Sequence, residues 1–317
     1  MTGSSMRPSR TNLQLTRLAL LTAIIVLTGC SSVPEPPDEI LDAQNRAAQL
    51  AGYGNNYFTR GQYRQALQFF EMSLRENLSV DHLPGVARSH NSIGRVYLAV
   101  EAYDSARLHF DAAYAIARDE NSPRLLQQSY TNLGELALRQ ADTAAARQYF
   151  TRGIAQLRPD ESSFEAAILY HNLAGLEHRE SNAGQARRLT EQALAINEAA
   201  RRFEEMAANY YLLAAIESQA GNQQQALEYA QRALANDKRM ENSTGIAQDL
   251  AAIAQIYTRM GDYDKAHDHY RRAYHVYSAL RLNAQAARVL DRLQETAALQ
   301  GDTDRADYYR ARRAAYE

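Results

Sequence analysis

The sequence has one cysteine, Cys30, and no tryptophan among its 317 residues. A single cysteine excludes an intrachain disulfide, and its position near the N-terminus leaves the rest of the chain without thiol chemistry. Proline and glycine are scarce, at 7 and 15 residues, which fits long helices joined by short turns. No run of basic residues is present and the net charge is −2, so we do not expect nucleic acid as a partner.

Catalytic and metal-binding patterns are also missing. The sequence contains no GxSxG, HExxH or P-loop motif, and its carboxylates show no paired arrangement for acid–base chemistry. His267 and His269 would point to different faces of one helix, whereas His171 and His178 would lie roughly 10 Å apart along a helix axis. We therefore expect neither an enzyme nor a metal site nor a cofactor.

The first 29 residues form a pattern of their own. Three arginines (Arg7, Arg10 and Arg17) precede an apolar stretch over 18–27, which is interrupted only by Thr22. The stretch is shorter than the roughly 20 residues that a transmembrane helix needs. It ends in Leu-Thr-Gly-Cys, with the cysteine at position 30. This ending resembles the lipobox of bacterial lipoproteins; the alternative is an ordinary signal peptide followed by a chance cysteine.

The lipobox resemblance implies that residues 1–29 are a lipoprotein signal peptide and that acyl chains, palmitate among them, are attached to Cys30. Several acyl chains together anchor a protein stably in a membrane. Ser31, in place of an aspartate, is similar to the sorting pattern of outer-membrane lipoproteins in Gram-negative bacteria, which implies a periplasm-facing protein. Residues 30–41 hold three prolines and are predicted to be an extended tether, and residues 42–317 the folded body.

One pattern in the body returns every 40 residues. In its clearest copy Gly94 is followed by Tyr97 and then by Ala106 and Phe110. This spacing is typical of two helices joined by a turn, with small residues where the helices approach each other. We therefore predict seven helix pairs, whose small first-helix positions include Gly54, Gly94, Gly134, Ala174, Ala214, Ala254 and, in a weaker last copy, the region of Leu293 and Ala297. Units three and four depart from the pattern, because Ala137 and Glu177 replace the first-helix tyrosine.

Each unit resembles a tetratricopeptide repeat (TPR), with 40 residues instead of the usual about 34. The resemblance covers residues 42–316 and implies an all-α, right-handed solenoid of seven helix pairs. It also implies a concave inner face lined by the first helix of each unit. Unit three is expected over about residues 123–159, and Arg310 and Arg313 in unit seven are expected to give the last unit a polar outer face.

In the TPR family, partners contact the second, fifth, sixth, ninth and thirteenth positions of each unit. Amides suit peptide-backbone recognition because they both donate and accept hydrogen bonds, and arginines suit acidic groups or a terminal carboxylate. The alternative interpretation is a solvated polar face. Carried onto this sequence, the family positions give as partner-binding candidates Arg88, Asn91, Ser92, Arg95, Gln128, Thr131, Asn132, Glu135, Arg139, His171, Asn172 and Tyr211.

Together the two resemblances imply an outer-membrane-anchored adaptor that binds a protein or peptide partner, such as an envelope protease or a peptidoglycan enzyme, in its concave face. A second interpretation is a pilotin-like assembly factor for a type IV pilus or secretion pore. The third is an enzyme with an active site that no motif reveals. A homodimer is left open, because such solenoids can pair through their terminal units.

Overall fold

A computed structural model describes residues 38–158 and 161–316. The predictions for residues 1–29, for lipidation of Cys30 and for the tether up to residue 37 lie outside these ranges. The described residues form fourteen α-helices and one short 3-10 helix, with no β-strand among them. Consecutive helices pack in seven pairs, as the 40-residue pattern predicts.

We number the pairs as units one to seven, and each unit has a first and a second helix joined by a short turn. The fourteen helices, in chain order by unit, are α2 (Asp38–Thr59) and α3 (Tyr63–Ser79), α4 (Leu83–Ala99) and α5 (Tyr103–Asp119), α6 (Pro123–Arg139) and α7 (Thr143–Ile154), α8 (Phe164–Arg179) and α9 (Ala183–Ala199), α10 (Phe203–Gln219) and α11 (Gln223–Arg239), α12 (Ser243–Met260) and α13 (Tyr263–Ala279), and α14 (Asn283–Leu299) and α15 (Thr303–Arg313), followed by the 3-10 helix η1 (Ala314–Tyr316).

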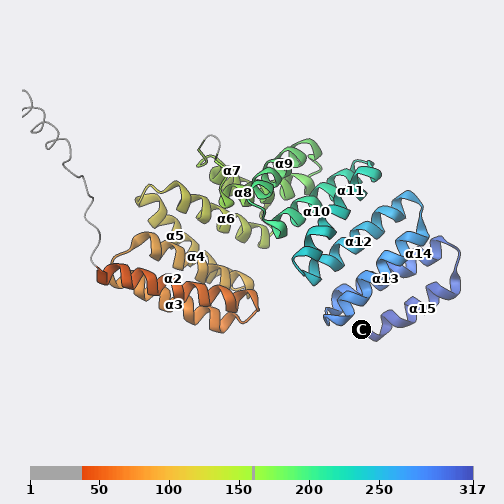
Figure 1. The fold of residues 1–317 in the computed structure, drawn as a ribbon, viewed down its shortest axis with the longest axis horizontal. Helices are drawn as coiled ribbons and strands as arrows, with labels where there is room; N and C mark the ends of the chain where they lie inside the picture. Colours follow the sequence, from red (N-terminus) through yellow and green to blue (C-terminus); the bar gives the residue numbers. More distant parts are fainter. Residues whose placement is uncertain (1–37, 159–160, 317) are drawn as a thin grey trace, which may run out of the picture.

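The units follow one another along an arc whose two ends bend toward the same side (Figure 1). The first helices of successive units contact each other from α2 through α12, so these helices line one continuous surface. We call this surface the inner face. Within the described ranges, no helix combines the length and apolar character that a membrane span requires.

Two boundaries differ from the prediction. Helix α2 begins at Asp38, so residues 38–41, which the sequence assigned to the tether, belong to the first helix. Helix α7 ends at Ile154 and has 12 residues, although unit three was expected to reach about residue 159. The sequence offers a reason, because in a continued helix Pro159 would have no N–H to donate to the carbonyl of Ala155 and its ring would clash with that carbonyl.

The small residues of the first helices are where the two helices of a unit meet. A Cβ atom on Gly94 would lie only 2.5 Å from the ring of Phe110, which is completely buried. Gly54 and Gly134 face Phe70 and Phe150 in the same way in units one and three. The absence of a side chain thus makes room for a phenylalanine, and each such pair forms the centre of its unit.

Units four and five use smaller partners. Their first helices carry Ala174 and Ala214, and the second-helix positions equivalent to Phe110 are Thr190 and Ala230. All four side chains are buried. The hydroxyl of Thr190 donates to the backbone carbonyl of Ala186 at 2.7 Å, so the buried polar atom is satisfied within its own helix.

Units four and five also replace the first-helix tyrosine by glutamates that link neighbouring units. Glu177 and Glu217 are both buried. Arg147 of the preceding unit forms an ion pair with Glu177, and Arg187 forms the equivalent pair with Glu217. Asn182 also donates to Glu177, at 2.7 Å. These carboxylates are therefore structural.

The turns and the last unit follow the prediction. Glycines in the turns of units one, five, six and seven have positive φ angles, for example 88° at Gly221. Other units place ordinary residues in the same left-handed conformation, such as Ala141 at φ 61°. In unit seven Arg310 is exposed, and Arg313 pairs with Asp291 at 3.2 Å.

Candidate functional site

A groove on the inner face brings together most of the residues predicted to bind a partner. Its volume is about 390 Å³. Family positions of units one to four supply ten of its lining residues, and the start of α8 supplies the other two. We call it the N-terminal groove, and it is lined by Asn55, Arg88, Asn91, Ser92, Arg95, Gln128, Thr131, Asn132, Glu135, Phe164, Glu165 and Ile168.

Two amides lie at the bottom of the N-terminal groove. Asn132 on α6 donates through Nδ2 to Oδ1 of Asn91 on α4, at 2.9 Å, and both side chains are buried. The Nδ2 atom of Asn91 is itself buried and has no hydrogen-bond partner. A buried donor without an acceptor costs about 1–3 kcal/mol, so this position favours a ligand that supplies an oxygen.

Arginines lie at the edge of the groove. Arg88 and Arg95 are exposed, and the guanidinium of Arg95 lies 5.0 Å from the ring centre of Phe58. Although much of the Arg88 side chain is exposed, partial desolvation of its guanidinium by the surrounding groove, and secondly the positive charge of Arg124, lowers the pKa of Arg88. Both effects disfavour the charged arginine, and an anion placed beside Arg88 would counter them.

Glu135 gives the groove an acidic group on α6. Burial raises the pKa of Glu135, and the positive charges of Arg95 and Arg139 act against this rise. Asn172 on α8 donates to Oε1 of Glu135 at 3.4 Å. Asn172 and Arg139 do not line the groove. Both act on Glu135, Arg139 from the next turn of α6 and Asn172 from the next unit.

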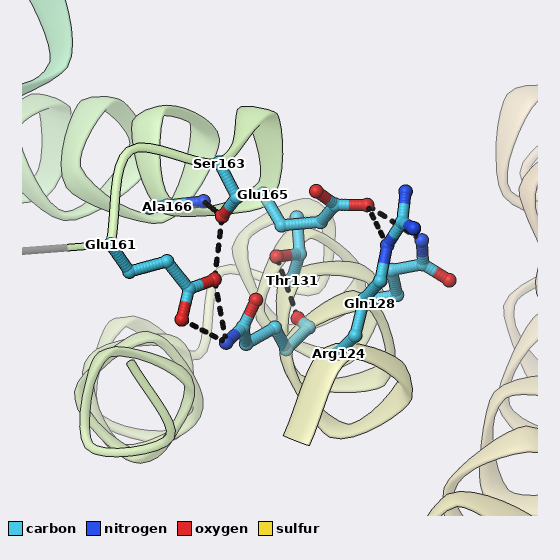
Figure 2. Close-up of polar contacts among 8 residues, drawn as sticks. Arg124, Gln128, Thr131, Glu161, Ser163, Glu165 and Ala166 are labelled. Carbon is cyan, nitrogen blue, oxygen red and sulfur yellow. Dashed lines mark hydrogen bonds and ion pairs between the residues drawn. The ribbon is translucent and has the colours of Figure 1, made fainter. Parts of the chain in front are cut away.

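Gln128 is held by a polar cluster between units three and four, which Figure 2 shows. Gln128 donates to Oε1 of Glu165 at 2.9 Å, and Arg124 donates to the same oxygen at 3.2 Å. Burial alone would raise the pKa of Glu165, but hydrogen bonds from Gln128 and the backbone, together with Arg124, lower it below its usual value. Glu161 and Ser163, in the connection after α7, form a second set of contacts beside this cluster. The cluster fixes α6 against α8 where α7 is short.

His171 and Tyr211 lie elsewhere. They line a second cavity of about 450 Å³ between α8, α10 and α12. Only these two of the lining residues were predicted from the sequence, because few family positions of units four to six were carried over. The same positions in units five and six also identify Ala208, Leu212 and Gln248 as lining residues. The signal was therefore present in the sequence.

One close pair of histidines was not predicted from the sequence. His90 on α4 and His109 on α5 lie on different helices, so their spacing in the sequence does not reveal that their Nδ1 atoms are 3.0 Å apart. Burial lowers the pKa of both imidazoles, which favours a hydrogen bond between neutral rings. Among the described residues, no group of three or more histidine, aspartate or glutamate side chains could hold a metal ion.

Comparison with protein families identifies the repeat. Residues 43–119 and residues 250–284 each match a family model of the tetratricopeptide repeat. The chain is a tetratricopeptide-repeat protein. The two matches fall on units one and two and on unit six, whose first helices keep the tyrosine of the pattern at Tyr57, Tyr97 and Tyr257. No curated protein matches the sequence.

Solved structures share the fold at low sequence identity. The apo form of RapI matches with a TM-score of 0.68 and 15% identity, covering 85% of this chain and 76% of RapI. A Rap protein in complex with competence and sporulation factor matches with a TM-score of 0.62 and 16% identity, covering 88% and 77% of the two chains. PilW, a type IV pilus biogenesis factor, matches with a TM-score of 0.54 and 18% identity, covering 77% of this chain and 98% of PilW.

These similarities indicate a protein-interaction scaffold or adaptor. Tetratricopeptide-repeat proteins bind protein or peptide partners and are generally non-catalytic. The inner face is the surface on which such a partner is expected, because it is the extended concave surface that stacked repeats create.

Proposed function

We propose that this protein is an adaptor that holds an extended acidic segment of a protein partner in the N-terminal groove. The observation that carries the proposal is the placement of a buried, unpartnered amide donor on Asn91 below the guanidinium groups of Arg88 and Arg95. An extended peptide offers backbone carbonyls to the amides and carboxylates to the arginines. The hydrogen-bonded Asn91–Asn132 pair is already in place, so binding requires little reordering of the protein.

The anchor belongs to the same proposal. The lipobox-like sequence ending at Cys30 supports attachment to the outer membrane, with the solenoid facing the periplasm. In that setting a protease or a peptidoglycan enzyme of the envelope is the first candidate partner. The fold match to PilW supports a second candidate function, a pilotin-like assembly factor for a type IV pilus or secretion pore.

Capture of a partner from envelope extract tests the groove. The tagged full-length chain is compared with the variant Arg88→Ala/Arg95→Ala/Asn132→Ala. A matched control changes two exposed arginines on second helices, Arg75→Ala and Arg188→Ala. We expect the wild type and the control to capture one partner and the groove variant to lose it while keeping its helical circular dichroism. Equal capture by all three proteins would place binding elsewhere.

The captured protein separates the two candidate functions. A soluble hydrolase supports the scaffold, and an oligomeric membrane ring supports the assembly factor. The anchor is tested by palmitate labelling of cells that express the wild type or Cys30→Ser. We expect label and outer-membrane fractionation in the wild type, and loss of both in the variant. Label that persists without Cys30 contradicts the anchor.

A further inference from the structure

A polar contact recurs where the second helix of one unit meets the first helix of the next. At the junction of units one and two, Asn77 donates to the hydroxyl of Ser89 at 3.3 Å. At the junction of units four and five, Asn197 donates to Asn209 at 2.9 Å. Both pairs are neutral and buried, and the two residues of each pair are 12 positions apart. Such a pair satisfies at least part of its own hydrogen-bonding capacity inside the protein.

The junction of units five and six breaks this rule. Here the equivalent residues are Asp237 and Asp249, which are 5% and 2% exposed. Asn242 donates to Oδ1 of Asp237 at 3.0 Å. Apart from a proton shared with Asp237, the Oδ2 atom of Asp249 has no hydrogen-bond partner. Two buried carboxylates therefore face each other where these two junctions place neutral groups that hydrogen-bond to each other.

These carboxylates line the 450 Å³ cavity between α8, α10 and α12, which we call the acidic pocket. Glu204 adds a third carboxylate, and no lysine or arginine is among the residues that line it. His171 does not supply a positive charge, because burial lowers its pKa and its Nδ1 atom lies 2.9 Å from the amide nitrogen of Asn209. Tyr211 forms part of the wall, and small residues, Ala207, Ala208 and Gly245, leave the space open.

Buried charges in proteins are stabilised by partners of opposite charge, and this pocket supplies none. In the empty pocket a proton takes that place: burial, and next the negative charge of Asp237, raise the pKa of Asp249 to about 8. The other titratable groups around the pair are Glu204 on α10, His171 on α8, Tyr211 on α10 and Tyr277 on α13, and none of them is cationic at neutral pH. Arg288 on α14 acts on Tyr277, but it does not line the pocket and is not among the groups that shift the pKa of Asp249.

We propose that the acidic pocket binds the cationic side chain of an arginine or lysine in an extended peptide segment. A guanidinium group donates several hydrogen bonds in one plane, which suits two neighbouring carboxylates, and it can stack against Tyr211. The cation replaces the shared proton, so binding releases a proton near neutral pH. The site goes beyond the proposed function, because it lies on units four to six and uses residues outside the N-terminal groove.

Direct binding of a defined peptide tests the inference. The probe is acetyl-Ala-Ala-Arg-Ala-Ala-amide, and its matched neutral control carries citrulline in place of arginine. Binding of both peptides to the full-length chain is measured by titration calorimetry at pH 6.5 and pH 8.5. At pH 8.5 we expect the arginine peptide to bind at least about tenfold more tightly than the citrulline peptide. At pH 6.5 this preference should be smaller, because protons compete with the guanidinium for the carboxylates. At pH 7 the binding heat should vary with the ionisation enthalpy of the buffer, as proton release requires.

Three variants separate this site from a general loss of folding and from the proposed function. The double variant Asp237→Asn/Asp249→Ser installs the neutral pair found at Asn77 and Ser89, so we expect it to remain folded and to lose the preference for arginine. Glu228→Gln removes an exposed carboxylate from α11 and should keep the preference. Asn132→Ala, in the N-terminal groove, should also keep it, so failure of the proposed function leaves this result unaffected. Equal binding of the two peptides to the wild type, or the same preference in the double variant, overturns the inference.

Discussion

Units one to three and units four and five reach the same backbone arrangement with different side chains. In the first group a glycine faces a phenylalanine, as Gly94 faces Phe110. In the second group alanine faces threonine or alanine, and a buried glutamate paired with an arginine of the preceding unit takes the place of a tyrosine. The backbone arrangement therefore depends on how well the side chains at contacting positions fill the space between the two helices. Different residue types can fill it, provided that the contacting positions change together.

The inner face changes over the same part of the chain. The N-terminal groove combines amides with the exposed arginines Arg88 and Arg95, whereas the acidic pocket holds Asp237, Asp249 and Glu204 without a cationic neighbour. The ligands proposed for the two sites therefore carry opposite charges. Four sets of substitutions test how these parts of the chain differ.

Removal of a central phenylalanine should have the largest effect. Phe150→Ala leaves a cavity beside Gly134 and should lower the free energy of unfolding by about 3–5 kcal/mol. Thr190→Ala, at the equivalent position of unit four, removes only a hydroxyl and a methyl group and should cost about 1 kcal/mol. Urea denaturation followed by circular dichroism measures both. Equal losses would show that the two groups of units are packed alike.

Addition of one methyl group tests the glycine side of the same contact. A Cβ atom on Gly134 would lie 2.3 Å from the ring of Phe150, so Gly134→Ala should destabilise the protein by about 1–3 kcal/mol. Gly52→Ala is the matched control, because Gly52 is also helical and no atom lies within 4 Å of the added Cβ. The control should be neutral or stabilising by up to about 1 kcal/mol. Thermal unfolding compares the two variants, and a loss of equal size in both would refute close approach as the cause.

The buried ion pair of unit four should be worth less than a phenylalanine. Glu177→Gln keeps the shape of the side chain but removes the charge that Arg147 contacts, and should cost about 1–2 kcal/mol. Arg271→Gln removes an exposed pair with Asp268 and should cost less than about 1 kcal/mol. Unfolding at low and at high salt measures both, and the Glu177 effect should depend less on salt. A larger loss at Arg271 would contradict a structural role for the buried pair.

The smallest expected effect is a dependence of the free energy of unfolding on pH. The pKa of Asp249 is about 8 in the folded protein, above its ordinary value, so the folded state binds more protons than the unfolded state between about pH 4 and pH 8. The free energy of unfolding should therefore fall as pH rises from 7 to 8, by up to roughly 1.4 kcal/mol per pH unit. Asp249→Asn should flatten this slope, whereas Glu228→Gln should leave it unchanged. A slope that survives Asp249→Asn would assign the titration to another group.

The sequence predicted the seven helix pairs because the packing positions recur at a fixed spacing, and periodicity survives when single residues change. It also predicted the N-terminal groove, since Asn91, Asn132 and Arg95 occupy family positions on adjacent first helices. The early end of α7 was missed, because Pro159 cannot take part in a helix that continues past Ala155, and this local effect outweighs the repeat. The pairing of Asp237 with Asp249 was missed for a different reason. It joins two units, and a scan along one helix does not reveal contacts between helices.

The short α7 has a mechanical consequence. A solenoid is held together by contacts between neighbouring units, so it bends most easily where those contacts are reduced. The short α7 lies along the chain between Asn132 on α6 and Asp249 on α12, and polar contacts such as those of Glu165 replace its missing helical turn. Bending there alters the span between the two inner-face sites. A ligand long enough to reach both would then set the curvature of the arc, and the arc would in turn select ligands by length.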